Sequence, residues 1–98
     1  MVDIQEIIPV GKDKRITAKR ITELTGLDGA HIRAEINRLR SEFVPIASDQ
    51  RGYYIAETPD DLSGTIAHIN HRIHKMIAAR EWLRRAIEKM QEEERKVI

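Results

Sequence analysis

The sequence predicts a mainly α-helical fold with one small β-hairpin and a long C-terminal helix, an α+β arrangement. Two short runs of helical spacing flank a glycine within residues 17–39, and two strand-like runs flank a turn within residues 44–56. From residue 62 onward, apolar side chains return at an average spacing of 3.5 residues. The 98 residues therefore divide into one small domain, residues 1–58, and a helical segment, residues 59–98.

The first predicted element is a short helix within residues 3–8. Asp3 suits its N-cap position, and Pro9 ends it because a residue before proline avoids the helical conformation. The side chains expected to face inward are Ile4, Ile7 and Ile8. A brief extended stretch is expected at residues 15–17, where Thr17 suits the N-cap of the next helix.

Two helices joined by a tight turn are predicted next. Ile21 and Leu24 lie three residues apart in the first helix, and Gly26 suits the left-handed residue that closes it. Asp28 suits the N-cap of the second helix, which we expect to run from Asp28 to about Glu42. Its side chains expected to face inward are Ile32, Ile36, Leu39 and Phe43. This is the pattern of a helix-turn-helix.

The outward face of this second helix has the composition of a DNA-reading surface. On a helical wheel, the residues away from the apolar stripe are Ala30, His31, Arg33, Ala34, Asn37, Arg38, Arg40 and Ser41. Small side chains let the helix backbone approach a major groove, and Arg and Asn suit bidentate contacts with base edges. An ordinary polar helix face is the alternative interpretation.

Residues 12–20 hold five cations and a single anion, Asp13. Basic side chains and helix amides in such a position meet phosphate oxygens, which fix a protein on DNA without reading its sequence. The predicted phosphate contacts are Thr17, Lys19, Arg20 and, from the second helix, Arg40. A solvated basic surface is the alternative here.

A β-hairpin is predicted directly after the two helices. Val44, Ile46 and the run from Tyr53 to Ala56 have strand composition, and residues 49–52, Asp-Gln-Arg-Gly, have turn chemistry. A helix-turn-helix followed by a hairpin is the arrangement of a winged helix.

Four motifs occur together in this region: Ile-Thr-Glu-Leu-Thr-Gly-Leu, Ile-x-x-x-Ile-x-x-Leu-Arg, Pro-Ile-x-Ser and Gly-Tyr-Tyr-Ile. With them, about 40 residues resemble winged helix-turn-helix domains of the biotin-operon-repressor kind. The resemblance implies binding of double-stranded DNA, with base contacts at His31, Arg33, Ala34, Asn37 and Arg38. It also implies contacts from the tip of the wing, at Gln50 and Arg51. Small proteins of this kind with a helical tail also resemble products of bacteriophage early regions.

A long helix is predicted from residue 59. The segment Thr58-Pro59-Asp60-Asp61 combines a cap, a proline suited to the first turn and two carboxylates at the positive end of the helix dipole. After Leu62, the seam positions are Ile66, Ile69, Ile73, Met76, Arg80, Leu83, Ile87, Met90, Glu94 and Val97. A repeat of this length is typical of a coiled coil. A helix of residues 60–94 would be roughly 50 Å long, longer than a small domain is wide, so we expect a homodimer through it.

Other arrangements of the helical segment stay open. The seam could fold back as a helical hairpin within one chain, or its first turns, at Leu62, Ile66 and Ile69, could pack on the preceding domain. Arg80 interrupts the apolar seam, where it could set the register or pair with Glu81 of a partner. Trp82 falls off the seam and suggests a further contact, such as a host protein.

Composition argues against several classes of function. Without cysteine there is no disulfide, thiol nucleophile or thiolate metal site. His68, His71 and His74 lack the i, i+4 pairing of helical zinc sites, so we expect no metal and no other cofactor. No phosphate-binding loop or nucleophile motif is present, and we predict no enzyme. Short apolar runs and the lack of a signal-peptide pattern predict no membrane segment and a cytoplasmic location.

We therefore expect a dimeric transcriptional regulator that binds double-stranded DNA. Its recognition helix, residues 28–42, would lie in the major groove and its wing, residues 49–52, on the flanking groove. The alternative is a protein-docking module, for instance a phage-encoded inhibitor or adaptor that uses the same fold without DNA, because the net charge is only +1. A third reading is a replication or packaging accessory that binds DNA within a larger assembly.

Overall fold

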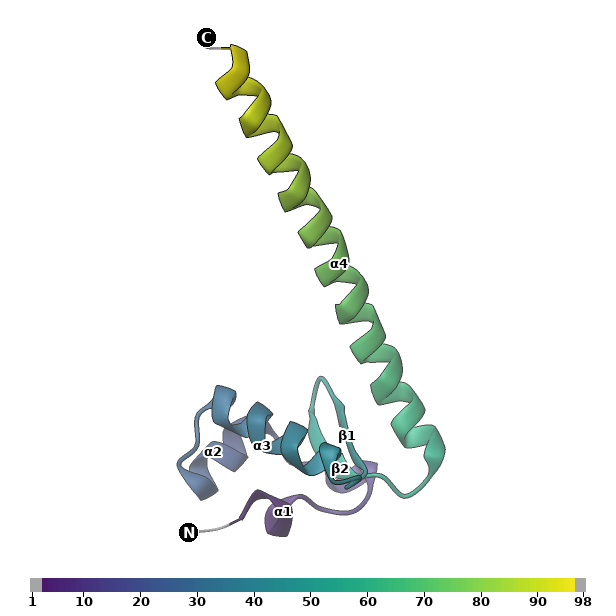
Figure 1. The fold of residues 1–98 in the computed structure, drawn as a ribbon. Coiled ribbons are helices and arrows are strands. Elements are labelled where there is room, and N and C mark those ends of the chain that lie inside the picture. Colours follow the sequence, from purple (N-terminus) through teal and green to yellow (C-terminus); the bar gives the residue numbers. More distant parts are fainter. Residues whose placement is uncertain (1–2, 97–98) are drawn as a thin grey trace. The chain divides into compact units, whose positions relative to one another are not determined.

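The computed structural model describes residues 3–96 of the chain. Its elements, in order, are α1 (Ile4–Ile7), the 3-10 helix η1 (Lys12–Lys14), α2 (Ala18–Thr25), α3 (Gly29–Ser41), β1 (Ile46–Asp49), β2 (Gly52–Ile55) and α4 (Pro59–Lys96) (Figure 1). The predicted helical fold with a small antiparallel hairpin and a long C-terminal helix is confirmed. The chain forms two compact units, Met1–Ile66 and Ala67–Ile98, so α4 begins in the first unit and ends in the second.

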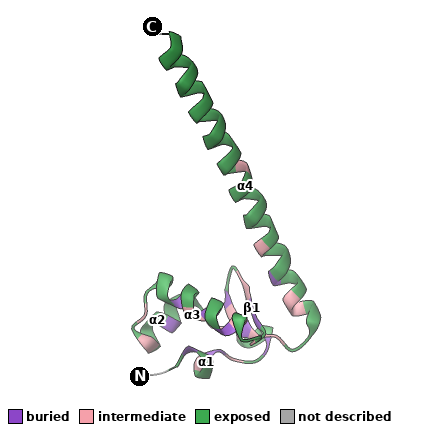
Figure 2. Cartoon of the chain, in the orientation of Figure 1, coloured by how far each residue is buried: buried purple, intermediate pink, exposed green. Residues whose placement is uncertain are grey.

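The core of the first unit is built almost entirely from isoleucine. Its buried residues are Ile4, Ile8, Ile21, Ile32, Ile36, Leu39 and Ile46. They come from α1, α2, α3 and β1, except that Ile8 follows the end of α1. The partly buried Leu27, from the turn between α2 and α3, packs against them. In Figure 2 the buried residues gather in these elements, whereas most of α4 is exposed. The inward-facing positions predicted for α3 are confirmed at Ile32, Ile36 and Leu39.

Three caps predicted from the sequence fix the boundaries of α2 and α3. The hydroxyl of Thr17 accepts a hydrogen bond from the amide of Arg20 at 3.1 Å, so α2 begins where expected. Gly26 ends α2 in the left-handed conformation, with φ 78°. Asp28 then caps α3 by accepting a hydrogen bond from the amide of His31 at 2.9 Å. The turn between the two helices therefore follows from local sequence chemistry alone.

Two apolar residues do not lie where the helical pattern predicted. Leu24, three residues after the fully buried Ile21, is 38% exposed. The prediction for Phe43 is wrong: its side chain is 92% exposed. The helix α3 ends at Ser41, and Phe43 adopts a positive φ of 67°, which breaks the helical spacing from Leu39. The amide of the next residue, Val44, donates a hydrogen bond to the carbonyl of Leu39. The side chain of Val44 is half-buried, whereas that of Phe43 is exposed.

The hairpin forms backbone hydrogen bonds with the segment before α2. Its register pairs Ile46 with Ile55 and Asp49 with Gly52. Ile16 and Tyr53 exchange two backbone hydrogen bonds, of 2.9 and 2.8 Å, which confirms the extended stretch predicted before α2. The amide of Ile55 also donates to the carbonyl of Pro9 at 2.7 Å, so β2 has backbone partners on both sides.

The first turns of α4 cover the other edge of the hairpin. The carboxylate of Asp61 accepts hydrogen bonds from the amides of Glu57 and Thr58 just before the helix. One turn later the buried hydroxyl of Thr65 lies 3.0 Å from the amide of Ser48 and 3.3 Å from its carbonyl oxygen. A side chain therefore satisfies the outer edge of β1 at Ser48, which would otherwise be an open strand edge.

We predict that Gly52→Ala destabilises the first unit by more than about 2 kcal/mol, because the new methyl group would collide with the carbonyl group of Ile16 and the φ of 148° is unsuited to alanine. Gly26→Ala is the matched control: its φ is also positive, but open space surrounds it, so we expect a loss of about 1 kcal/mol. Chemical denaturation measures both variants, and equal losses would contradict the close approach to Ile16.

We also predict that Thr65→Val lowers the free energy of unfolding by about 1–3 kcal/mol, because valine keeps the shape of threonine but leaves the amide of Ser48 without its partner. Thr65→Ser retains the hydroxyl and should lose less. Thermal unfolding followed by circular dichroism compares the two, and the same midpoint for both would show that the hydroxyl does not hold the strand edge.

Candidate functional site

The outward face of α3 is the largest group of predicted site residues that the fold brings together. His31, Arg33, Ala34, Asn37 and Arg38 are all exposed, whereas the apolar residues that alternate with them are buried in the core. Because the core fixes the rotation of α3 about its axis, these five side chains are presented on one continuous surface. The predicted inward and outward faces of this helix are therefore correct except at Phe43, which is exposed, and Arg40, which is half-buried.

Arg33 and Gly29 form a pair that the sequence analysis did not identify. A Cβ atom placed on Gly29 would lie 3.3 Å from Nη1 of Arg33, so the guanidinium group reaches back over the first turn of α3. Glycine leaves room for this conformation. No ion pair holds Arg33 within residues 3–96, and its donors remain available on the outward face.

His31 is drawn back onto the cap of α3. Its Nδ1 lies 2.7 Å from Oδ1 of Asp28, the same oxygen that accepts the amide of His31. These contacts lower the pKa of Asp28, and the hydrogen bond from the backbone amide of His31 contributes most. The His31 ring therefore remains on the exposed face, with one nitrogen already engaged.

Arg38 is engaged by acidic neighbours on its own helix. Its guanidinium group forms ion pairs with Glu35 at 3.0 Å and with Glu42 at 3.1 Å. The hydrogen bond with Arg38 lowers the pKa of Glu35, and that with Glu35 raises the pKa of Arg38. Arg38 would have to exchange these partners before it could contact a base.

Arg40, predicted to contact phosphate, links α3 to the hairpin. Its Nε donates to the carbonyl of Ile46 at 3.0 Å, and its Nη2 donates to the hydroxyl of Ser48 at 3.2 Å. The side chain is half-buried, so most of its hydrogen-bonding capacity is directed inward. The sequence contains no signal for this role, because an arginine on a helical wheel gives no indication of a strand packed beside it.

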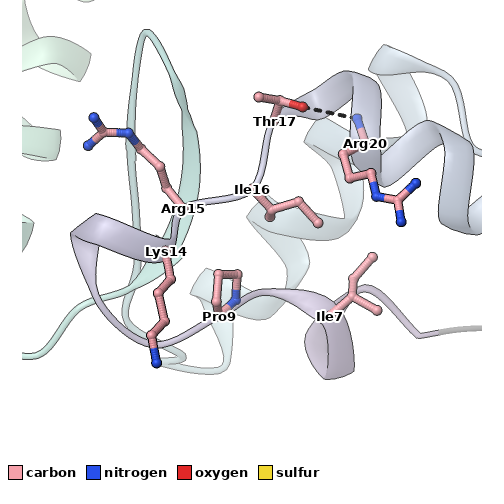
Figure 3. Close-up of a pocket in the computed structure, with 7 residues that line it drawn as sticks. All are labelled: Ile7, Pro9, Lys14, Arg15, Ile16, Thr17 and Arg20. Carbon is pink, nitrogen blue, oxygen red and sulfur yellow. Dashed lines mark hydrogen bonds between the residues drawn. The ribbon is translucent and has the colours of Figure 1, made fainter.

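The beginning of α2 forms a second basic surface. Thr17, Lys19 and Arg20 are exposed there, and Arg20 pairs with Glu23 at 3.0 Å. Beside them is a shallow depression of about 420 Å³, lined by Ile7, Pro9, Lys14, Arg15, Ile16, Thr17 and Arg20. Figure 3 shows Lys14 and Arg20 on opposite sides of its apolar residues, whereas Arg15 turns away from them. The depression is open and only partly apolar, so it adds positive charge to the start of α2 without enclosing a ligand.

Asp49 organises the hairpin turn and connects it to Arg15. Its Oδ1 accepts hydrogen bonds from the amides of Arg51 and Gly52, and its Oδ2 lies 2.9 Å from Nη1 of Arg15. Both partners of this ion pair are largely buried, with side chains 18% and 25% exposed. The predicted tip residues, Gln50 and Arg51, are left exposed on a turn with a fixed backbone.

The seam side chains of α4 are exposed along most of the helix. The exposed apolar members are Ile66, Ile73, Met76, Leu83, Ile87 and Met90, with exposed fractions from 43% to 67%, and Ile69 is half-buried. Arg80 lies 3.6 Å from Glu81 of the same helix, and Arg84 lies 3.0 Å from that carboxylate. Glu94 is exposed, whereas Val97 lies outside the described residues. Trp82 is exposed beside the seam.

Within residues 3–96, no cluster of three or more His, Cys, Asp or Glu side chains could hold a metal ion. That part of the chain also contains no helix of sufficient length and apolarity to span a membrane. His68, His71 and His74 are separately exposed along α4.

Comparison with known proteins adds no relative. No protein-family model matches the chain, and no curated protein or solved structure shows a significant match to it. The site must therefore be interpreted from its own geometry.

We predict that acid weakens the cap of α3. A carboxyl group whose pKa is lower in the folded state stabilises that state above its unfolded pKa, and this contribution is lost as pH falls through the folded pKa. The pKa of Asp28 is lowered in this way, so stability should decline as pH falls through 3.8, the ordinary pKa of an aspartate, and below it. Asp28→Asn keeps a capping oxygen but does not titrate, so the decline should be shallower. Denaturant midpoints across this range test the prediction, and identical pH profiles for the two proteins would contradict it.

Proposed function

We propose that this protein is a winged helix-turn-helix regulator that binds double-stranded DNA as a dimer. In this proposal α2 and α3 are the helix-turn-helix, α3 lies in the major groove, and the hairpin β1–β2 is the wing on the flanking groove. The observation that carries the proposal is the outward face of α3, on which the predicted base-contacting residues are exposed together while the opposite face is buried.

The chemistry of this face suits the reading of base edges. Arg33 and Asn37 lie one helical turn apart, so their side chains point to neighbouring base pairs. Arginine forms bidentate contacts with guanine and asparagine with adenine. Ala30 and Ala34 allow the helix backbone to come close to the groove floor. Arg33 supports the proposal most directly, because it has no ion-pair partner within residues 3–96.

The remaining predicted contacts would fix the position of the protein on the DNA backbone. Lys19 and the amides at the start of α2 suit phosphate oxygens. Arg51 lies at the exposed hairpin tip, where an arginine suits a narrow minor groove. A dimer with two-fold symmetry would then recognise an inverted repeat whose half-sites lie about 34–36 Å apart, or a multiple of that distance.

A second candidate function is protein docking, as in a phage-encoded inhibitor or adaptor. The observation that favours it is Phe43, which is 92% exposed and held by a backbone with positive φ, a conformation that costs energy for a residue with a side chain. Exposed aromatic side chains are typical anchors of protein interfaces. Residues 1–58 also carry nine Lys or Arg and nine Asp or Glu, so no large excess of positive charge favours DNA over protein.

We predict different effects from the two classes of DNA contact. Arg33→Ala and Asn37→Ala should each cost about 1–3 kcal/mol on a selected operator and relax base preference at one position. Lys19→Ala should weaken binding to every sequence and reduce the salt slope by about one. Fluorescence anisotropy with the selected operator and with random duplex measures these effects, and Lys89→Ala, on α4, is the matched control. Unchanged binding by all three variants would show that the assigned face is wrong.

The dependence on salt separates the two candidate functions. Binding through several phosphates should fall by orders of magnitude between about 50 and about 200 mM salt, because it releases counterions. An apolar interface around Phe43 should respond little. Random-sequence duplex DNA therefore provides the first test. Absence of binding at both salt concentrations would exclude the DNA-binding proposal and direct the search to protein partners, with Phe43→Ala as the diagnostic variant.

A further inference from the structure

The seam of α4 has the residue pattern of a two-stranded parallel coiled coil. Taking Ile73 as heptad position a, the a positions are Ile66, Ile73, Arg80, Ile87 and Glu94, and the d positions are Leu62, Ile69, Met76, Leu83 and Met90. β-Branched isoleucine occupies three of the five a positions, and Leu or Met occupies four of the five d positions, a distribution that favours two parallel helices. From Ile69 to Met90 the pattern covers three heptads within the second unit. Three heptads is the shortest repeat that indicates a coiled coil.

The flanking positions of the seam are compatible with a second copy of the same helix. In a parallel pair, each g residue lies beside the e residue five positions later on the other helix. These pairs are Arg72 with Ile77, Ala79 with Arg84, and Ala86 with Gln91. None of them brings two like charges together. The flanks therefore oppose neither self-association nor the parallel orientation.

Arg80 is the exception, because parallel pairing in register places two copies of it in one layer of the seam. Its neighbour Glu81 lies outside the seam and holds Nε of Arg80 at 3.6 Å, while the same carboxylate holds Nη1 of Arg84 at 3.0 Å. This draws the guanidinium charge of Arg80 toward the flank. The methylene stem of Arg80 can then cover the seam while its charged end stays in water.

We propose that α4 pairs with α4 of a second copy, parallel and in register, and that Arg80 is the residue that sets the register. A parallel pairing shifted by one heptad places Arg80 against Ile73 or Ile87, and an antiparallel pairing places it against an apolar d residue. A shift of two heptads would place it against Glu94 but would leave two heptads of each seam unpaired. Parallel pairing in register instead gathers both charges into one layer, where each has Glu81 beside it. The proposal rests on the dimer of the proposed function, but its tests require no DNA. A dimer that does not bind DNA would overturn the DNA-binding function and leave this inference intact. A monomer that binds DNA would overturn this inference, and the dimer with it, but leave DNA binding intact.

The sharpest test mixes the wild-type chain with the Arg80→Glu variant. If the two positions face each other, an arginine and a glutamate share the layer in the mixed dimer, and native mass spectrometry should find it well above the half expected from random mixing. Arg85→Glu, on the solvent face of the same helix, is the matched control and should mix randomly. Random mixing of the Arg80→Glu variant, or monomers alone, would overturn the proposal.

Cross-linking tests the orientation independently. The chain has no cysteine, so Met90→Cys introduces a single thiol near one end of the seam. Parallel helices bring the two thiols together, whereas an antiparallel pair centred near Arg80 separates them by about 30 Å. Rapid disulfide formation is expected, with Glu92→Cys, on the outer face, as the slow control. Equal rates for the two variants would overturn the parallel orientation.

The role of Glu81 is tested by a double-mutant comparison of dimer dissociation constants from sedimentation. Arg80→Ile should tighten the dimer by about tenfold or more, because it replaces the charged layer with an apolar one. Glu81→Gln should weaken the wild-type dimer several-fold but leave the Arg80→Ile dimer unchanged. The same effect in both backgrounds would show that Glu81 does not act through Arg80.

Discussion

The first unit depends on the closure of the hairpin against the segment that precedes α2. Ile16 and Tyr53 exchange two backbone hydrogen bonds, and Gly52 is the residue that lets the two segments approach so closely. The ion pair between Arg15 and Asp49 joins the residue before Ile16 to the last residue of β1, which pairs with Gly52. Since Thr17 caps α2 immediately after this junction, the start of α2 and the turn of the hairpin are held together as one rigid body. Two surfaces that are separate in sequence, the basic start of α2 and the tip at Arg51, thereby gain a fixed relation.

The hairpin is only four residues long on each strand, and a hairpin of this size is marginal by itself. Its stability comes from the elements that surround it. Arg40 reaches from α3 to two groups of β1, and Thr65 reaches from α4 to both backbone groups of Ser48. At the edge of β1, polar side chains thus form the hydrogen bonds with backbone groups that a third strand would form in a larger sheet. As a consequence, Arg40 directs two of its donors toward β1. A helical wheel assigns this side chain to the outer surface, but part of its hydrogen-bonding capacity stabilises the fold.

Local chemistry explains which parts of this structure the sequence could predict. The caps at Thr17 and Asp28, the left-handed Gly26 and the buried stripe of α3 each depend on residues within four positions, and each is confirmed. The hairpin tip also follows from a local signal, because Asp49 and Gly52 belong to one turn. The burial predicted for Phe43 was wrong because the prediction continued the apolar stripe of α3 beyond the end of the helix. Phe43 itself has a left-handed backbone, which changes the direction of the side chains that follow. The roles of Arg40 and Thr65 could not be predicted, because their partners lie on a strand whose position depends on the whole fold.

The arginines show how far the same side chain is redirected by its neighbours. Arg33 and Arg38 lie on the same exposed face of α3, but Arg38 has Glu35 three residues before it and Glu42 four residues after it. Arg33 instead has Gly29 four residues before it and Asn37 four residues after it, and neither is acidic. One guanidinium group is consequently neutralised within the helix, and the other reaches over a bare glycine toward the outside. On α4, Glu81 has a third effect on its neighbour Arg80. Its carboxylate holds the guanidinium group of Arg80 to one side of the apolar seam. The balance of nine cations and nine anions in residues 1–58 therefore conceals an uneven surface. Ion pairs engage Arg15, Arg20 and Arg38. Within residues 3–96, Lys12, Lys14, Lys19, Arg33 and Arg51 have no ion-pair partner, and the last three are residues that the proposed function assigns to DNA.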